Sequence, residues 1–360
     1  MVIGGPGTGK SVLALLRARR LARSGRKYVV LMFNHLLKQA SHGLFRGQLS
    51  CETWKRWYWR IFKEITNQDA PLVPTTQEGS FRPFDWKRIE GIIDQTDWGK
   101  QHLNIVIDEG QDMPPEFYSS LVGLGFENFF VVADQNQQIT DENSSRQDIE
   151  NALAIDASEV IELRTNFRNS RSVAELARTF YTGDPASPPP LLPRHPDMKT
   201  AELYSFPSGG FQQIIRRILL TADKNPHKLV GVIAPNNSVR EQYLSALRTT
   251  LDSDSLTLQH GQPLIRTYSH GKQTNVKLDM GGIIVLNVQA CKGQEFEIVI
   301  CIDVDEHYIP ADDLDMAKKQ FYVMVARARE RVVMLRRKGV ESRLDSILPT
   351  DESVLRRKEI

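Results

Sequence analysis

The stretch that decides the fold is Gly4-Gly5-Pro6-Gly7-Thr8-Gly9-Lys10-Ser11, which begins after three residues of the chain. It follows the pattern G-x-x-x-x-G-K-S, in which backbone N–H groups surround a phosphate chain, the lysine reaches the outer phosphates and the serine holds Mg²⁺. Val2 and Ile3 predict the end of a strand before it, and Val12 to Leu16 predict the start of a helix after it. We therefore expect this octet to bind a nucleoside triphosphate.

Composition sets the broad class. The chain has 360 residues, of which 41% are hydrophobic and 25% charged, values typical of a globular protein with room for two domains. Neither an apolar run of the ~18 residues that cross a bilayer nor a signal peptide is found, so we expect no membrane partner. The odd number of cysteines (Cys51, Cys291 and Cys301) and their spacing favour a reduced, cytoplasmic setting.

The overall charge says little about partners. The net charge of +2 neither requires nor excludes nucleic acid. Basic residues crowd the stretch from Arg17 to Lys27, which is more typical of a solvated helix face than of a binding site.

Apolar, β-branched runs recur between helical stretches, and runs that are apolar throughout are typical of strands buried in a parallel sheet. The predicted strands are Tyr28–Phe33, Ile105–Ile107, Phe129–Ala133, Leu229–Ala234, Ile283–Leu286, Ile298–Ile302 and Val332–Leu335. Their grouping predicts an α/β fold with two parallel sheets in series. We place the first domain at residues 1–158, with an insertion at about 50–100, the second at 159–350, and a tail at 351–360.

Two segments do not fit this alternation. Six of the 18 prolines lie between Pro185 and Pro196, which predicts an extended connection. All five tryptophans lie between Trp54 and Trp98, and the first of them alternate with lysines and arginines. Aromatic rings among cations are typical of a surface on which single-stranded nucleic acid stacks. The same pattern fits the hydrophobic core of an inserted subdomain with a charged outer face, and the sequence leaves both interpretations open.

The strand at Ile105–Ile107 is followed directly by Asp108 and Glu109. A carboxylate at a strand end can hold the Mg²⁺ that bridges the outer phosphates, so Asp108 and Ser11 are candidate metal ligands, and Glu109 can take a proton from an attacking water. Gln137, which follows the third predicted strand, can sense the γ-phosphate or orient that water. With Lys10, these residues predict hydrolysis of the nucleotide and not its binding alone.

After the phosphate-binding octet, five further segments follow along the chain: Asp108-Glu109-Gly110-Gln111-Asp112, Ala133 to Ile139, Leu163 to Ser170, Lys292-Gly293-Gln294-Glu295-Phe296, and Phe321 to Glu330. In content and order these six segments resemble the superfamily 1A helicases of the UvrD/Rep type, and the resemblance covers nearly the whole chain. The resemblance implies two RecA-like domains that use ATP and Mg²⁺.

The resemblance also assigns roles in the second domain. It implies that Phe167 stacks on the base, that Gly293 and Glu295 contact the nucleotide, with Glu295 on the sugar, and that Arg168 and Arg327 are arginine fingers that reach the γ-phosphate. Because both arginines belong to the second domain, hydrolysis would depend on closure between the two domains.

For nucleic acid, the resemblance implies single-stranded DNA, without excluding RNA, contacted through Asn34, Thr53, Trp54 and Gln289. The chain departs from the family in this respect. The three residues before Gly4 leave no room for the segment that clamps adenine in the family, residues 140–144 are acidic where relatives carry stacking aromatics, and Asn287 and Gln289 replace a threonine and a histidine. The hydrolytic residues, in contrast, match the family.

The resemblance favours an ATP-driven motor, a 3′–5′ DNA helicase or translocase. The altered nucleic-acid segments keep a second hypothesis open, an ATP-gated regulatory or binding subunit of a nuclease or defence complex that does not unwind. A phosphate-loop kinase or small-molecule ATPase is the weakest alternative, because it leaves Arg168, Lys292-Gly293 and Arg327 without a role.

Overall fold

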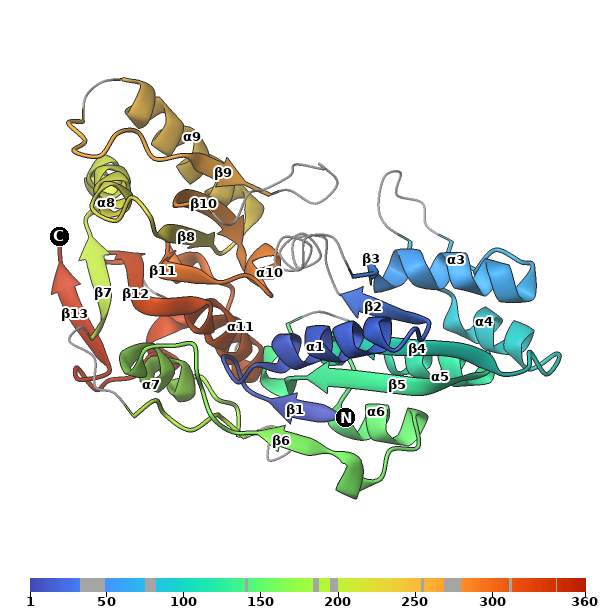
Figure 1. The fold of residues 1–360 in the computed structure, drawn as a ribbon. Helices are drawn as coiled ribbons and strands as arrows, with labels where there is room; N and C mark the ends of the chain where they lie inside the picture. Colours follow the sequence, from blue (N-terminus) through green and yellow to red (C-terminus); the bar gives the residue numbers. More distant parts are fainter. Residues whose placement is uncertain are drawn as a thin grey trace. The chain divides into compact units, whose positions relative to one another are not determined.

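The protein is described by a computed structural model that covers residues 1–32, 49–74, 82–139, 142–183, 188–194, 200–253, 256–268, 280–310, 313–340 and 342–360. The chain divides into two compact units, residues 1–4 with 9–163 and residues 5–8 with 164–360. Each unit contains one sheet in which neighbouring strands run parallel (Figure 1), which confirms the predicted α/β class. Within the described ranges, no helix is long and apolar enough to span a bilayer.

The first unit has a six-stranded sheet in the order β3-β2-β4-β5-β1-β6. Its strands are β1 (Val2–Gly4), β2 (Tyr28–Met32), β3 (Cys51–Thr53), β4 (Gln101–Ile107), β5 (Phe126–Ala133) and β6 (Ile161–Leu163). Strand β6 pairs with β1, so the first unit extends to Leu163 and not to the expected boundary at residue 158. The three strands predicted for this region are confirmed as β2, β4 and β5.

Helices cover both faces of this sheet because successive strand residues point to opposite sides. Val30, Val106 and Val132 pack under helix α1 (Lys10–Arg23). Their chain neighbours Leu31 and Ile107 face the opposite side. That side is covered by α3 (Trp54–Thr66), α4 (Trp86–Ile93), α5 (Pro115–Gly123) and α6 (Arg146–Ala152).

The tryptophan-rich segment is part of this main core. Trp54, Trp57 and Tyr58 on α3 are at most 2% exposed and share one cluster with the sheet residues Leu31 and Ile107. The ring of Trp54 packs edge-on against Phe117 of α5 at a centroid distance of 5.1 Å. The prediction that Trp54 contacts nucleic acid is therefore wrong for this conformation, because its ring has no exposed face. Trp59, on the outer side of α3, is 42% exposed.

Replacing Trp54 with alanine is expected to destabilise the protein by about 3–5 kcal/mol, the usual cost of removing a large buried aromatic side chain. The matched change Trp59→Ala removes an exposed ring, and its expected cost is within about 0.5 kcal/mol. Denaturant unfolding monitored by circular dichroism compares the two variants. Equal losses of unfolding free energy would contradict the assignment of Trp54 to the core.

The second unit has a seven-stranded sheet in the order β13-β7-β12-β11-β8-β10-β9. Its strands are β7 (Ala201–Phe206), β8 (Leu229–Ala234), β9 (Ile265–Thr267), β10 (Gly282–Asn287), β11 (Phe296–Cys301), β12 (Ala328–Arg337) and β13 (Leu355–Glu359). Helices α8 (Phe211–Asp223) and α9 (Asn237–Asp252) share a hydrophobic core with one face of the sheet. Helices α7 (Arg171–Thr179) and α11 (Leu314–Ala326) pack against each other and on β12, and α10 (Val288–Cys291) is short.

The last ten residues are not the tail that we expected. They contain β13, which pairs in parallel with β7 at the edge of the sheet. Glu202 of β7 forms ion pairs with Lys358 of β13 and with Arg331 of β12, and these pairs join the three strands. Charged residues are common on edge strands, where they discourage further pairing.

Candidate functional site

Three neighbouring strands of the first unit, β4, β5 and β1, are parallel and therefore end at the same edge of the sheet. Ligands of open α/β sheets bind at the carboxyl ends of the strands. The segments that follow these ends carry Asp108 and Glu109 after β4, Asp134 and Gln137 after β5, and the phosphate loop after β1. The topology thus brings together the residues predicted to carry hydrolysis.

The phosphate loop turns through left-handed backbone conformations that glycine adopts without strain. Gly7 has φ +73° and Gly9 has φ +93°, and α1 begins directly after Gly9, at Lys10. The Thr8 hydroxyl donates to the Gly5 carbonyl at 2.8 Å and braces the turn. The first N–H groups of a helix have no partner within it and attract anions, so the start of α1 is suited to a phosphate group.

Lys10 is linked to Gln137 through Asp134. The Lys10 Nζ lies 3.6 Å from Asp134 Oδ2, and the same oxygen accepts a hydrogen bond of 2.6 Å from Gln137 Nε2. All three side chains are buried, with Lys10 the most exposed at 8%. Our sequence interpretation gave Asp134 no role, although it lies in the quoted segment from Ala133 to Ile139.

Gln111 connects this group to Glu109. The Gln111 Nε2 donates to Glu109 Oε2 at 2.7 Å, and the backbone N–H of Asp134 donates to Gln111 Oε1 at 2.9 Å. Gln111 is fully buried, so both ends of its amide are used inside the protein. Gln111 belongs to the segment Asp108-Glu109-Gly110-Gln111-Asp112, which resembles the helicase family, and this position could have identified it as a functional residue. We assigned it no function from the sequence. One buried network, which includes the backbone N–H of Asp134, therefore runs from Lys10 to Glu109.

Asp108 and Ser11 suit a magnesium ion. The Ser11 hydroxyl donates to Asp108 Oδ1 at 3.1 Å, and Asp108 Oδ2 is buried without a hydrogen-bond partner in the described part of the protein. Burial and the neighbouring Glu109 raise the pKa of Asp108 to about 7. A nearby cation would satisfy this carboxylate. The described residues contain no group of three metal-ligating side chains, but Mg²⁺ in phosphate sites commonly uses one or two protein ligands together with phosphate and water.

The raised pKa of Asp108 predicts a pH-dependent effect on stability. An acid whose pKa is higher in the folded state destabilises the fold progressively as pH rises from its unfolded value, near ~4, to its folded value. Asp108→Asn removes this penalty, so we expect its melting temperature without Mg²⁺ to exceed that of the wild type by a few degrees more at pH 8 than at pH 5. Added Mg²⁺ should stabilise only the wild type. An equal difference at both pH values would contradict this account.

In the second unit, Glu295 bridges two arginines. Its Oε1 lies 2.8 Å from Arg168 Nη1, and its Oε2 lies 2.7 Å from Arg329 Nη2. Burial alone would raise the pKa of Glu295, but the two guanidinium groups outweigh it and lower the pKa to about 2. Phe167, next to Arg168, is 81% exposed. The structure thus pairs two of the predicted nucleotide contacts, Arg168 and Glu295, with each other.

Arg327 lies directly after the last residue of α11. It is 2% exposed, and its Nε donates to the carbonyl oxygen of Val323 at 3.1 Å.

Gly293 has φ +74°, a left-handed conformation that favours glycine. Of the predicted nucleic-acid contacts, Gln289 on α10 is exposed and Thr53 at the end of β3 is partly buried. Asn34 lies outside the described residues.

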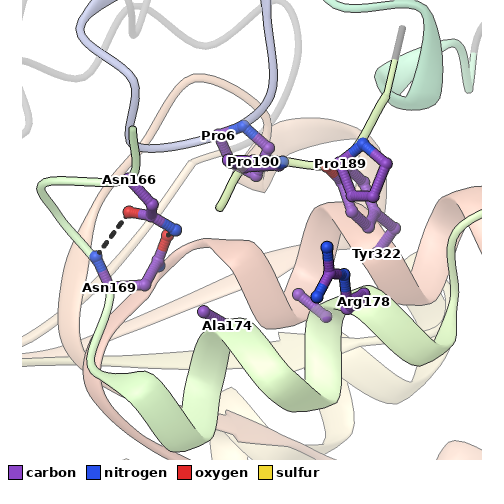
Figure 2. A pocket seen from close by; sticks show the side chains of 9 residues that line it. Pro6, Asn166, Asn169, Ala174, Arg178, Pro189, Pro190 and Tyr322 are labelled. Carbon is purple, nitrogen blue, oxygen red and sulfur yellow. Dashed lines mark hydrogen bonds between the residues drawn. The ribbon is translucent and has the colours of Figure 1, made fainter. Parts of the chain in front are cut away.

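The proline-rich connection contributes to a pocket in the second unit, lined by Pro6 of the phosphate loop, Asn166, Asn169, Pro189 and Pro190 (Figure 2). A β-carbon on Gly5 would lie 2.4 Å from Pro190 Cδ, so only glycine fits there. The Leu191 N–H donates to the Arg164 carbonyl at 2.7 Å and holds the connection in place. The prolines of this connection that the structure describes, Pro188, Pro189, Pro190 and Pro193, are outside helices and strands, as predicted.

Comparisons with known proteins agree with part of this interpretation. The sequence model of the UvrD-like helicase C-terminal domain matches residues 282–335, which include Gly293, Glu295 and Arg327. A comparison with curated protein sequences finds no match. Among solved structures, the C-terminal domain of a possible DNA helicase from Lactobacillus plantarum WCFS1 is similar, with a TM-score of 0.37 and 12% identity over 54% of this chain and 99% of that chain. Residues 282–335 are therefore similar to a UvrD-like helicase C-terminal domain, which confirms the resemblance to the UvrD/Rep-like helicases for this segment of the chain.

Proposed function

We propose that this protein hydrolyses ATP and uses it to move along single-stranded nucleic acid, as a 3′–5′ DNA helicase or translocase. The observation that carries the proposal is the buried network from Lys10 through Asp134 and Gln111 to Glu109 at the sheet edge. A protein that only bound a nucleotide would need the phosphate loop but not a buried carboxylate held beside it. The UvrD-like family match supports the helicase-type part of the proposal.

In the proposed mechanism, the loop from Gly4 to Ser11 binds the phosphates, and Ser11 and Asp108 would hold Mg²⁺. The metal ion would neutralise charge on the phosphate oxygens. Glu109 accepts a proton from the attacking water, and Gln111 orients the Glu109 carboxylate through its amide at 2.7 Å. In this proposal Gln111 is a positioning residue, because it acts through Glu109.

The proposal gives Asp134 a part in sensing the nucleotide. Lys10 and Gln137 both engage the Asp134 carboxylate. A phosphate group would attract the Lys10 ammonium and weaken its pairing with Asp134. Gln137 donates to the same Asp134 oxygen, so a weaker Lys10–Asp134 pair would also alter the hydrogen bond of Gln137. We propose Gln137 as the γ-phosphate sensor.

The second unit would supply Arg168 and Arg327 to the γ-phosphate, Phe167 to the base, and Gly293 and Glu295 to the nucleotide. Arg168 would exchange its pairing with Glu295 for the phosphate. Glu295 has Arg329 as a second partner, at 2.7 Å, so its charge remains compensated when Arg168 leaves. The exposed ring of Phe167 is suited to stacking on a base.

The second candidate, an ATP-gated regulatory or binding subunit of a nuclease or defence complex, is favoured by one group of contacts. Glu142, from the acidic segment after Ile139, forms an ion pair of 2.8 Å with Lys55 on α3. This pair neutralises a cation of the tryptophan-rich helix, and Trp54 beside it is buried. Both features reduce the surface that a nucleic acid strand could use, without changing the hydrolytic residues.

The rate of ATP hydrolysis with and without nucleic acid distinguishes the two candidates. We expect single-stranded DNA to raise the turnover number, and a panel that includes duplex DNA and single-stranded RNA shows which nucleic acid acts. A high rate that no nucleic acid changes would contradict the motor proposal. A slow rate that rises only with a co-purified effector protein would favour the regulatory subunit.

Lys10→Ala serves as the control for contaminating ATPases in this assay. The variant loses the ammonium that contacts the outer phosphates, so we expect turnover to fall by at least about 100-fold. Circular dichroism spectra should match the wild type, because the lysine makes no contribution to the hydrophobic core. Turnover that persists in Lys10→Ala would mean that the phosphate loop is not the site of hydrolysis.

A further inference from the structure

Asn169 connects two distant segments of the second unit. It lies one residue after Arg168, and its side-chain Nδ2 donates to the carbonyl oxygens of Ala326 at 3.0 Å and of Ala328 at 2.5 Å. These carbonyls belong to the residues on either side of Arg327. One amide group therefore holds the backbone before and after this arginine.

The orientation of the Asn169 amide is fixed by its partners. Carbonyl oxygens only accept hydrogen bonds, so the NH₂ group must face Ala326 and Ala328. The remaining oxygen, Oδ1, accepts from Asn166 Nδ2 at 3.0 Å. Asn166 Oδ1 in turn accepts from the backbone N–H group of Arg168 at 3.0 Å. It also accepts from the backbone N–H group of Asn169 at 3.1 Å (Figure 2). The two asparagines thus link the backbone at Arg168 to the backbone at Arg327.

The backbone around Arg327 is constrained on both sides. Helix α11 ends at Ala326 and strand β12 begins at Ala328, so Arg327 is the single residue between them. Its own carbonyl accepts from the Phe296 N–H at 3.0 Å. Asn169 is 6% exposed, so water cannot easily replace its bonds to the flanking carbonyls.

We propose that Asn169 is a positioning residue that fixes the backbone on both sides of Arg327 and so determines where this side chain can reach. The inference rests on the proposed function, in which Arg327 acts on the γ-phosphate. Arg168 Nη2 also donates to the Ala326 carbonyl at 2.8 Å. When Arg168 turns to a phosphate and releases this carbonyl, Asn169 retains it, which keeps Arg327 in place.

The neighbouring Ser170 provides a matched control. Its hydroxyl donates to the Glu330 carbonyl at 3.1 Å and so joins the same two segments three residues beyond Arg327. If Asn169 only ties the segments together, Asn169→Ala and Ser170→Ala should have similar effects. If Asn169 positions Arg327, only its removal should slow the chemical step.

The test is steady-state ATP hydrolysis by the full chain with saturating single-stranded DNA. For Asn169→Ala we expect kcat to fall about ten- to hundredfold, as for a catalytic group displaced by a fraction of an ångström to 1 Å, with KM for ATP changed by less than about twofold. Ser170→Ala should retain both parameters. Asn169→Ser keeps one hydroxyl donor, so its kcat should lie between those of the wild type and Asn169→Ala.

Arg327→Ala, measured in parallel, separates this inference from the proposed function. If Arg327→Ala is inactive and Asn169→Ala or Asn169→Ser has the kcat of Ser170→Ala, the positioning role is wrong while the arginine finger stands. If Arg327→Ala keeps full turnover, both the arginine finger and the positioning role are wrong. Loss of the folded state in both Asn169 variants, seen by thermal unfolding, would also contradict a positioning role, because Asn169→Ser still offers a donor.

Discussion

The candidate site depends on the adjacency of three parallel strands in the first unit. The register pairs Ile107 of β4 with Val131 of β5, and Ile3 of β1 with Ala133 of β5. Asp108, Asp134 and Gly4 each follow one of these residues, so the loops that they open meet at one edge of the sheet. A shift of one strand by a single residue would turn these side chains toward the opposite face. The network from Lys10 to Glu109 can form only because this register is held by the buried core on both faces.

Within this arrangement, backbone conformation separates two adjacent carboxylates. Glu109 has φ +56°, a left-handed conformation that is uncommon for residues other than glycine. Asp108 bonds to Ser11, whereas Glu109 bonds to Gln111, so each carboxylate has its own partner. Strained residues of this kind are frequent at functional sites. In the proposed reaction, this separation leaves Asp108 to bind the metal ion and Glu109 to accept the proton of the attacking water.

The strands with long apolar runs could be predicted from the sequence, because strands in the middle of a parallel sheet are buried on both faces. Strand β13 could not, since its Arg356, Arg357 and Lys358 lie at an edge where charge is tolerated. The aromatic pattern of α3 was compatible with either a core or a stacking surface, and only the packing of Trp54 on Phe117 distinguishes them. The bonds of Asn169 to Ala326 and Ala328 span 157 and 159 residues of sequence, separations at which local pattern gives no signal.

The proposed hydrolysis depends on the network at the first sheet edge, with Glu109 as the general base. The most direct test is a single-turnover experiment with excess protein, in which ATP binding and phosphate release are followed for the wild type and for Glu109→Gln. We expect Glu109→Gln to bind ATP with Mg²⁺ about as tightly as the wild type but to cleave it about 10²–10⁴-fold more slowly, the usual contribution of a general base. Cleavage by Glu109→Gln at the wild-type rate would contradict this proposal.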